Sequence, residues 1–202
     1  MLSTVWVTGM VPEIQEVKMS TYPIQSLDSA PQDSRPFLQG LRQSLGMIPN
    51  LAAAMAESPE LLKGFLTVRG IYHGGTFSPA EIEVLSLTAA FENNCAWCMT
   101  FHTRMAHNAG VSEESIDALR EGRPPVEPRL AALSDFAREM VQRRGAVETA
   151  TLERFYGAGY SRAQALEVVL GMGFSLMANY AGHLTDVPLD EPLKPHAWQP
   201  PS

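Results

Sequence analysis

Helix start signals recur along this chain and constrain its fold more than any other feature. Ser78-Pro79-Ala80-Glu81 is a complete capping box with proline at the first helical position, and Ser161 and Gln164 have the spacing of a second box. Ser58-Pro59 and Ser112 are further N-cap candidates. No segment alternates apolar and polar residues as a strand does, and no repeat of fixed period stands out. The chain is therefore predicted to be all-α.

The segments between these signals keep helical spacing and end at glycines or asparagines. They predict helices over 34–45, 51–56, 59–72, 79–92, 95–110, 113–121, 128–144, 148–157 and 161–183. Residues 1–33 are rich in proline and serine, and residues 187–202 contain five prolines. We expect an extended N-terminal arm over 1–33, a single helical domain over 34–186 and an extended C-terminal tail over 187–202.

Composition excludes several classes of function. Charged residues make up 18% of the chain, below the roughly 25% typical of soluble domains. This low fraction favours helices that are buried on more than one face, and partner subunits could cover some of these faces. The net charge of −7 argues against binding to a nucleic-acid backbone. The most apolar segment, 166–184, contains Glu167, Asn179 and His183, so a core helix is expected there and no membrane span. The first residues lack the pattern of a secretory signal, and we expect a cytoplasmic protein.

Cys95 and Cys98 are the two cysteines of the chain, and they stand in one C-x-x-C motif. This excludes a disulfide-rich scaffold and indicates redox chemistry or metal binding. At helical spacing Cys95, Cys98 and His102 fall within an arc of about 60° on the apolar side, whereas Thr100 and Thr103 point outward. Both thiols are predicted in the first turn of a helix capped by Asn93-Asn94, where the helix dipole stabilises a thiolate.

Glu83 falls in the middle of an apolar arc on the preceding helix. A buried carboxylate costs several kcal/mol unless it is paired or protonated. Such a group suits a proton shuttle. A dithiol, an imidazole and a buried carboxyl group are what two-electron thiol chemistry with a peroxide needs.

Other interpretations of these residues stay open. The cysteines could be small buried hydrophobes. They could instead bind zinc with His102, completed by His73, His107 or His183. Glu83 could lie at a subunit interface or pair with an arginine, and Trp97 and Phe101 could be packing residues of the core or of a subunit interface.

One pattern in the chain resembles the active-site signature of AhpD-like alkylhydroperoxidases. It consists of Glu83, eleven intervening residues, the Cys95-x-x-Cys98 motif, three further residues and His102. These alkylhydroperoxidases belong to the carboxymuconolactone decarboxylase superfamily. Further segments resemble the peroxidase-related branch of this superfamily, and with them the likeness covers roughly residues 35–187. These segments are Leu45-Gly-Met-Ile-Pro-Asn50, Ser58-Pro59, Gly74-Gly-Thr-Phe-Ser-Pro79, His107-Asn-Ala-Gly110, Gly159-Tyr-Ser161 and Asn179.

The resemblance implies an AhpD-like helical fold, homo-oligomers and reduction of hydrogen peroxide or organic hydroperoxides. Cys98 would be the peroxidatic thiol and Cys95 the resolving, more exposed one, with His102 and Glu83 as proton relay. Electrons would come from an external dithiol, such as a lipoyl-type protein, and neither cofactor nor metal is expected. The best-understood members have a second histidine where this chain has Trp97.

Three alternatives to the peroxidase remain. The first is decarboxylase-like or lactone-processing carbon chemistry on the same fold, which needs no thiol pair. The second is a general disulfide oxidoreductase that acts on protein thiols. The third is a non-enzymatic zinc or redox-sensing module.

Overall fold

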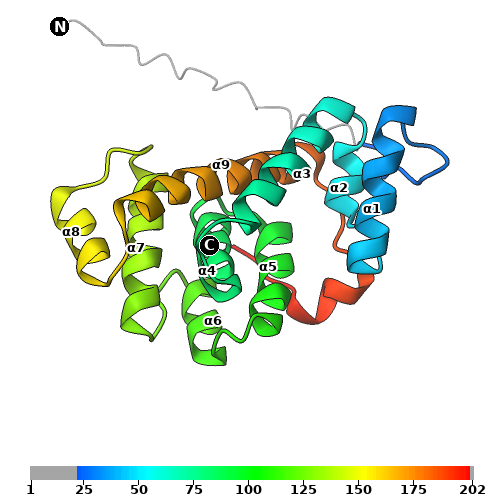
Figure 1. Cartoon of the computed structure of the whole chain (residues 1–202). Coiled ribbons are helices and arrows are strands. Elements are labelled where there is room, and N and C mark those ends of the chain that lie inside the picture. Colours follow the sequence, from blue (N-terminus) through cyan, green and yellow to red (C-terminus); the bar gives the residue numbers. More distant parts are fainter. Residues whose placement is uncertain (1–21, 201–202) are drawn as a thin grey trace, which may run out of the picture.

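The computed structural model describes residues 22–200, so most of the expected N-terminal arm lies outside the described residues. Within 22–200 the chain forms helices and no strand, which confirms the all-α prediction (Figure 1). Each predicted helix is present, with its ends shifted by no more than two residues. The helices are α1 (Arg35–Leu45), α2 (Asn50–Met55), α3 (Pro59–His73), α4 (Pro79–Glu92), α5 (Ala96–Asn108), α6 (Glu113–Arg120), α7 (Pro128–Gln142), α8 (Thr149–Gly157) and α9 (Arg162–Thr185), with short 3-10 turns η1 (Gln32–Ser34) and η2 (Glu191–His196).

The predicted caps form at the starts of α3, α4 and α9. Ser58 accepts the backbone N–H of Leu61, and both capping boxes, Ser78 with Glu81 and Ser161 with Gln164, are complete. These bonds satisfy backbone N–H groups that have no partner inside the helix.

Helix α4 is the centre of the molecule. All its residues from 81 to 90 are buried, and it packs against α5, α6, α7 and α9 (Figure 1). A helix covered on all sides has no solvent-facing side for its polar residues. Its buried polar side chains therefore need partners inside the protein, which Glu83 and Thr88 have, whereas Ser86 Oγ has none among the described residues.

Helix α9 crosses the molecule above α4 and also contacts α2, α3, α5 and α7 (Figure 1). Its outward side exposes a stripe of large apolar residues, Leu166, Val169, Leu176, Tyr180 and Leu184. In the described part of the chain, no helix combines the length and the apolar character of a membrane span.

The C-terminal segment differs from the expected extended tail. Glu191–His196 form η2, which packs against α5, and in the arm Gln32–Ser34 form η1 (Figure 1). Arg120 donates to the carbonyl oxygens of His196 and Ala197, at 3.0 Å each. It also donates to Thr103 Oγ1 at 2.9 Å. Thr103 and Thr100, predicted to face outward, are buried because α6 and this segment cover that side of α5.

Gly171 on α9 leaves room for the ring of Tyr72. A Cβ at Gly171 would lie 2.7 Å from Tyr72 Cζ, whereas one at Gly173 would meet no atom within 4 Å. We expect Gly171→Ala to lower the free energy of unfolding by about 1–3 kcal/mol, because the buried ring must shift. Gly173→Ala should raise it by up to about 1 kcal/mol through helix propensity. Urea denaturation measures both, and equal effects of the two variants would contradict this packing.

Glu81 joins the start of α4 to α7. It accepts hydrogen bonds from Ser78 N at 2.9 Å and from Arg129 Nη2 at 3.0 Å. Burial raises the pKa of Glu81, but these bonds outweigh it and hold the pKa below the ordinary value of 4.5. The carboxylate therefore stabilises the fold above that pH, and this contribution is lost as the pH falls through the folded-state pKa.

Glu81→Gln should accordingly destabilise the protein most near neutral pH. The difference from wild type should shrink as the pH falls below about 4, because both proteins then carry an uncharged group. Urea denaturation at a series of pH values measures this difference. A difference that stays constant with pH would mean that the charge of Glu81 is irrelevant to stability.

Candidate active site

The turn between α4 and α5 places Cys95 at the N-cap of α5, not in its first turn. Its Sγ accepts the backbone N–H of Cys98 at 3.4 Å. The predicted Asn93-Asn94 cap is therefore wrong. Asn93 instead ends α4, with its side-chain amide donating to Ala89 O, and Asn94 takes a left-handed φ of 52°. Asparagine tolerates this conformation, and the sharp turn aims Cys95 Sγ at free N–H groups.

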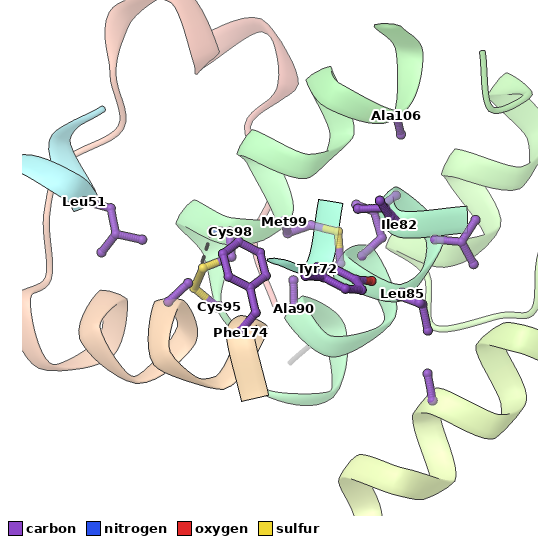
Figure 2. Close-up of a cluster of buried hydrophobic side chains, with 14 of the residues drawn as sticks. Leu51, Tyr72, Ile82, Leu85, Ala90, Cys95, Cys98, Met99, Ala106 and Phe174 are labelled. Carbon is purple, nitrogen blue, oxygen red and sulfur yellow. Dashed lines mark hydrogen bonds between the residues drawn. A yellow bond between two sulfur atoms is a disulfide. The ribbon is translucent and has the colours of Figure 1, made fainter. Parts of the chain in front are cut away.

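Cys95 and Cys98 are joined by a disulfide inside the core. Their Cα atoms are 5.3 Å apart, and both sulfurs lie among apolar side chains that include Leu51 and Phe174 (Figure 2). The resemblance implied that Cys95 is the more exposed thiol. In this structure both cysteines are buried, with Cys95 2% and Cys98 1% exposed. How a small molecule can reach each buried cysteine therefore depends on the cavity that the cysteine lines.

Glu83 and His102 form a buried pair. Glu83 Oε2 lies 2.7 Å from His102 Nδ1, and the two side chains are 9% and 13% exposed. An ionised carboxylate can only accept, so Nδ1 carries the hydrogen and Nε2 of the neutral ring has a free lone pair. Glu83 thus has the partner that its place on an apolar face requires.

A cavity of about 80 Å³ brings Cys98, Glu83 and His102 together. Its walls are mostly apolar and come from α1, α2, α3, α4, α5 and α9. Trp97 and Phe101 stack on each other in this wall, with ring centroids 5.2 Å apart. These two aromatic residues, which the sequence could also explain as packing residues, border the space next to the Cys98 sulfur. A cavity of this volume has room for several waters or a small organic molecule, since one water needs roughly 10–15 Å³.

Arg69 and His73 on α3 also line this cavity, and the sequence analysis did not assign them to the site. Burial first, and then the neighbouring Arg69, lower the pKa of His73. Among the described residues, no carboxylate forms an ion pair with Arg69. Arg69 and His73 are four residues apart and therefore share one face of α3. This spacing is the sequence signal that could have placed them together.

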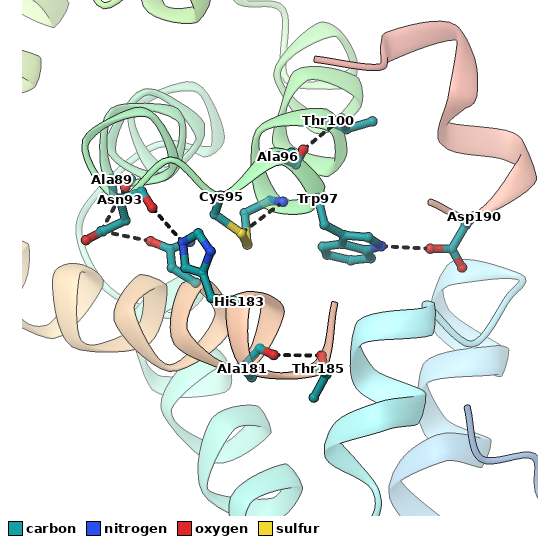
Figure 3. Close-up of a disulfide and its surroundings, with 12 residues drawn as sticks. Ala89, Asn93, Cys95, Ala96, Trp97, Thr100, Ala181, His183, Thr185 and Asp190 are labelled. Carbon is teal, nitrogen blue, oxygen red and sulfur yellow. Dashed lines mark hydrogen bonds between the residues drawn. A yellow bond between two sulfur atoms is a disulfide. The ribbon is translucent and has the colours of Figure 1, made fainter. Parts of the chain in front are cut away.

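Asp190 is a second residue that the sequence analysis missed. Its carboxylate accepts Trp97 Nε1 at 3.1 Å and the backbone N–H of Asn50 at 2.9 Å (Figure 3). Burial raises the pKa of Asp190. The residue comes from the proline-rich tail, and nothing in the local sequence indicates that this tail reaches the C-x-x-C motif.

The histidines considered as zinc ligands lie in different places. His73 borders the cavity, His107 lies at the end of α5 beside His196, and His183 bonds to the Asn93 carbonyl oxygen. Within residues 22–200, no three or more His, Cys, Asp or Glu side chains are grouped as a metal site requires.

Comparison with known proteins places these features in a family. The sequence model of the carboxymuconolactone decarboxylase family matches residues 59–139, which include Glu83, Cys95, Cys98 and His102. No curated protein matches the chain significantly.

Several solved structures share the fold. One is the alkylhydroperoxidase AhpD core of an uncharacterized peroxidase-related protein from Ralstonia eutropha JMP134, with a TM-score of 0.76 and 18% identity over 87% of this chain and 94% of that one. A peroxidase-related protein from Silicibacter sp. TM1040 has a TM-score of 0.72 and 20% identity over 90% and 97%. The debrominase Bmp8 in complex with 2,3,4-tribromopyrrole has a TM-score of 0.71 and 16% identity over 87% and 94%. The chain therefore contains a carboxymuconolactone decarboxylase family domain over residues 59–139 and has the AhpD-like fold.

Proposed function

We propose that this protein is a thiol-dependent peroxidase that reduces hydrogen peroxide or organic hydroperoxides through a Cys95–Cys98 disulfide. The observation that carries the proposal is the shared cavity, in which Cys98 meets the hydrogen-bonded Glu83–His102 pair. A sulfur nucleophile beside a buried proton relay suits cleavage of an O–O bond.

In the first step the Cys98 thiolate attacks the nearer oxygen of the peroxide. The O–O bond breaks, Cys98 becomes a sulfenic acid, and the distal oxygen leaves as an alkoxide or hydroxide. His102 Nε2 takes the proton of the Cys98 thiol and then gives it to this leaving group, and Glu83 stabilises the ring while it is protonated.

In the second step Cys95 attacks the Cys98 sulfur. The S–OH bond breaks, the disulfide forms, and water leaves after it takes the proton from Cys95. The two electrons that reduce the peroxide have then come from the two thiols. Cys95 is suited to this step because its sulfur lies at the N-cap, where the Cys98 N–H and the helix dipole stabilise a thiolate.

The apolar walls of the cavity support organic hydroperoxides as substrates beside hydrogen peroxide. Arg69 adds a positive charge that suits substrates with an acidic group. The solved debrominase with this fold binds a brominated pyrrole, so the fold itself does not restrict the chemistry to peroxides.

The proposal includes an external dithiol donor, such as a lipoyl-type protein, which reduces the disulfide to two thiols. It also includes assembly into a homo-oligomer. The exposed apolar stripe of α9 supports assembly, because monomeric proteins rarely expose such a continuous apolar surface.

Cys98→Ser should abolish peroxide consumption driven by dihydrolipoamide, since serine is no nucleophile toward peroxides here. Cys95→Ser should still react once and accumulate one equivalent of sulfenic acid on Cys98, because no resolving thiol is present. An NADH-coupled turnover assay and a sulfenic-acid label measure the two effects.

Other outcomes would replace this proposal. Turnover of another substrate that survives Cys98→Ser would favour carbon chemistry on the same fold. Rapid disulfide exchange with proteins, together with slow peroxide consumption, would favour a general disulfide oxidoreductase. Bound zinc, or redox-dependent assembly without turnover, would favour a sensing module.

Glu83→Gln tests the relay with little change of shape. We expect kcat/KM for peroxide to fall about 100-fold or more, the range typical of a lost general acid–base group. Glu92→Gln is the matched control, because Glu92 lies on the same helix and pairs with Arg138 at 2.9 Å, outside the cavity. If both variants retain wild-type kcat/KM, the Glu83–His102 pair has no part in proton transfer.

A further inference from the structure

The two cysteines of the disulfide line two different cavities. Cys98 borders the cavity with Glu83 and His102, whereas Cys95 borders a second cavity of about 200 Å³. The second cavity is also lined by His183 and Asp186 at the end of α9 and by residues of the tail, including Val187 and Trp198. Trp97 lines both cavities and therefore separates them.

Gly182 lets the backbone of α9 approach Cys95 closely beside the second cavity. A Cβ at this position would lie 3.1 Å from Cys95 Sγ, closer than a side chain ordinarily packs. Because glycine has no Cβ, no side chain of residue 182 stands between this cavity and Cys95.

His183 projects from the next position, and a hydrogen bond determines its tautomer. Its Nε2 lies 2.6 Å from the carbonyl oxygen of Asn93 (Figure 3). A carbonyl oxygen only accepts, so Nε2 carries the hydrogen and Nδ1 of the neutral ring has a free lone pair. A neutral imidazole with one lone pair available, in the same cavity as an oxidised sulfur, has the features of a general base.

We propose that the second cavity binds a small dithiol donor and that His183 is the general base for its attack on Cys95. The inference rests on the proposed function, because it assigns the step that regenerates the two thiols. The assignment also places a histidine on the Cys95 side of the site. The position before Cys98, where the resemblance would place a second histidine, is Trp97 in this chain.

The step balances in thiols and electrons. One donor thiol gives its proton to His183 Nδ1, and its sulfur attacks Cys95 Sγ. The Cys95–Cys98 bond breaks, and Cys98 leaves as a thiolate that takes a proton from solvent or from the His102 side. The second donor thiol then attacks the donor sulfur of the mixed disulfide, and Cys95 leaves and takes up the second proton. The donor ends as a cyclic disulfide, oxidised by two electrons, and the protein is reduced by two.

The position of Cys95 at the N-cap favours the last step, in which Cys95 is the leaving group. Its sulfur accepts the Cys98 N–H, so the helix start stabilises Cys95 when it leaves as a thiolate in the last step. A better-stabilised thiolate leaves faster in thiol–disulfide exchange.

The test follows reduction of the oxidised full-length protein by dihydrolipoamide in a stopped-flow instrument. The disulfide form is made with diamide, so the measurement needs no peroxidase activity. His183→Gln can still donate a hydrogen bond to Asn93 O but cannot take a proton. We expect it to slow reduction at least 10-fold near pH 7. His107→Gln is the control, because His107 faces Glu113 at the far end of α5 and should leave the rate within twofold of wild type.

The pH profile separates a base from a merely structural histidine. The donor ionises by itself as the pH rises toward about 9, so the defect of His183→Gln should shrink there. Besides His183, Asp186 is the other acid–base side chain of this cavity, while Asp190 is turned toward Trp97 and Asn50.

Gly182→Ala tests the cavity independently of His183. It should slow reduction by the dithiol several-fold, and by a larger factor than it slows oxidation of the reduced protein by peroxide. A wild-type reduction rate for His183→Gln at every pH overturns the proposed base, and a defect equal at all pH values does so too. If wild type consumes no peroxide, the proposed function fails while the reduction experiment still decides this inference.

Discussion

The hydrogen bond between Glu83 and His102 is the interaction around which the site is organised. It exists because α4 is covered on every side, so a carboxylate on that helix is buried wherever it points. Burying the charge without a partner would cost several kcal/mol, and a histidine from α5 meets that requirement. The same bond fixes the imidazole tautomer and directs Nε2 toward the cavity that holds Cys98. A structural need of the core and a chemical need of the site are thus met by one contact.

Most of the fold could be predicted because its signals are local. Capping boxes such as Ser78 with Glu81 act within one turn, and they place helix starts within a residue or two. The arc that joins Cys95, Cys98 and His102 is likewise a property of one helix. Glu83 could be paired with this arc because both helices are strongly apolar on the facing sides.

The features that could not be predicted from the sequence depend on contacts between distant segments of the chain. Thr103 was expected outside because helical spacing cannot show that the C-terminal segment and Arg120 cover that face. Asp190 could not be linked to Trp97 for the same reason. The cap of α5 was misassigned because asparagine is a common N-cap, whereas a cysteine sulfur as an N-cap acceptor is unusual. The separate cavities on the two sides of the disulfide follow from how α9 and the tail pack, which no local pattern shows.

The contact of Asp190 with Trp97 and Asn50 has a consequence for biosynthesis. Trp97 is the wall between the two cavities, and the carboxylate that holds its indole comes from a segment close to the C-terminus. A nascent chain can form α4 and α5, and thus the Glu83–His102 pair, long before that segment leaves the ribosome. Until then Trp97 lacks its anchor, and the Cys95 side lacks one of its walls. The thiol pair is therefore enclosed on both sides only after the segment 182–199 has been synthesised and has packed.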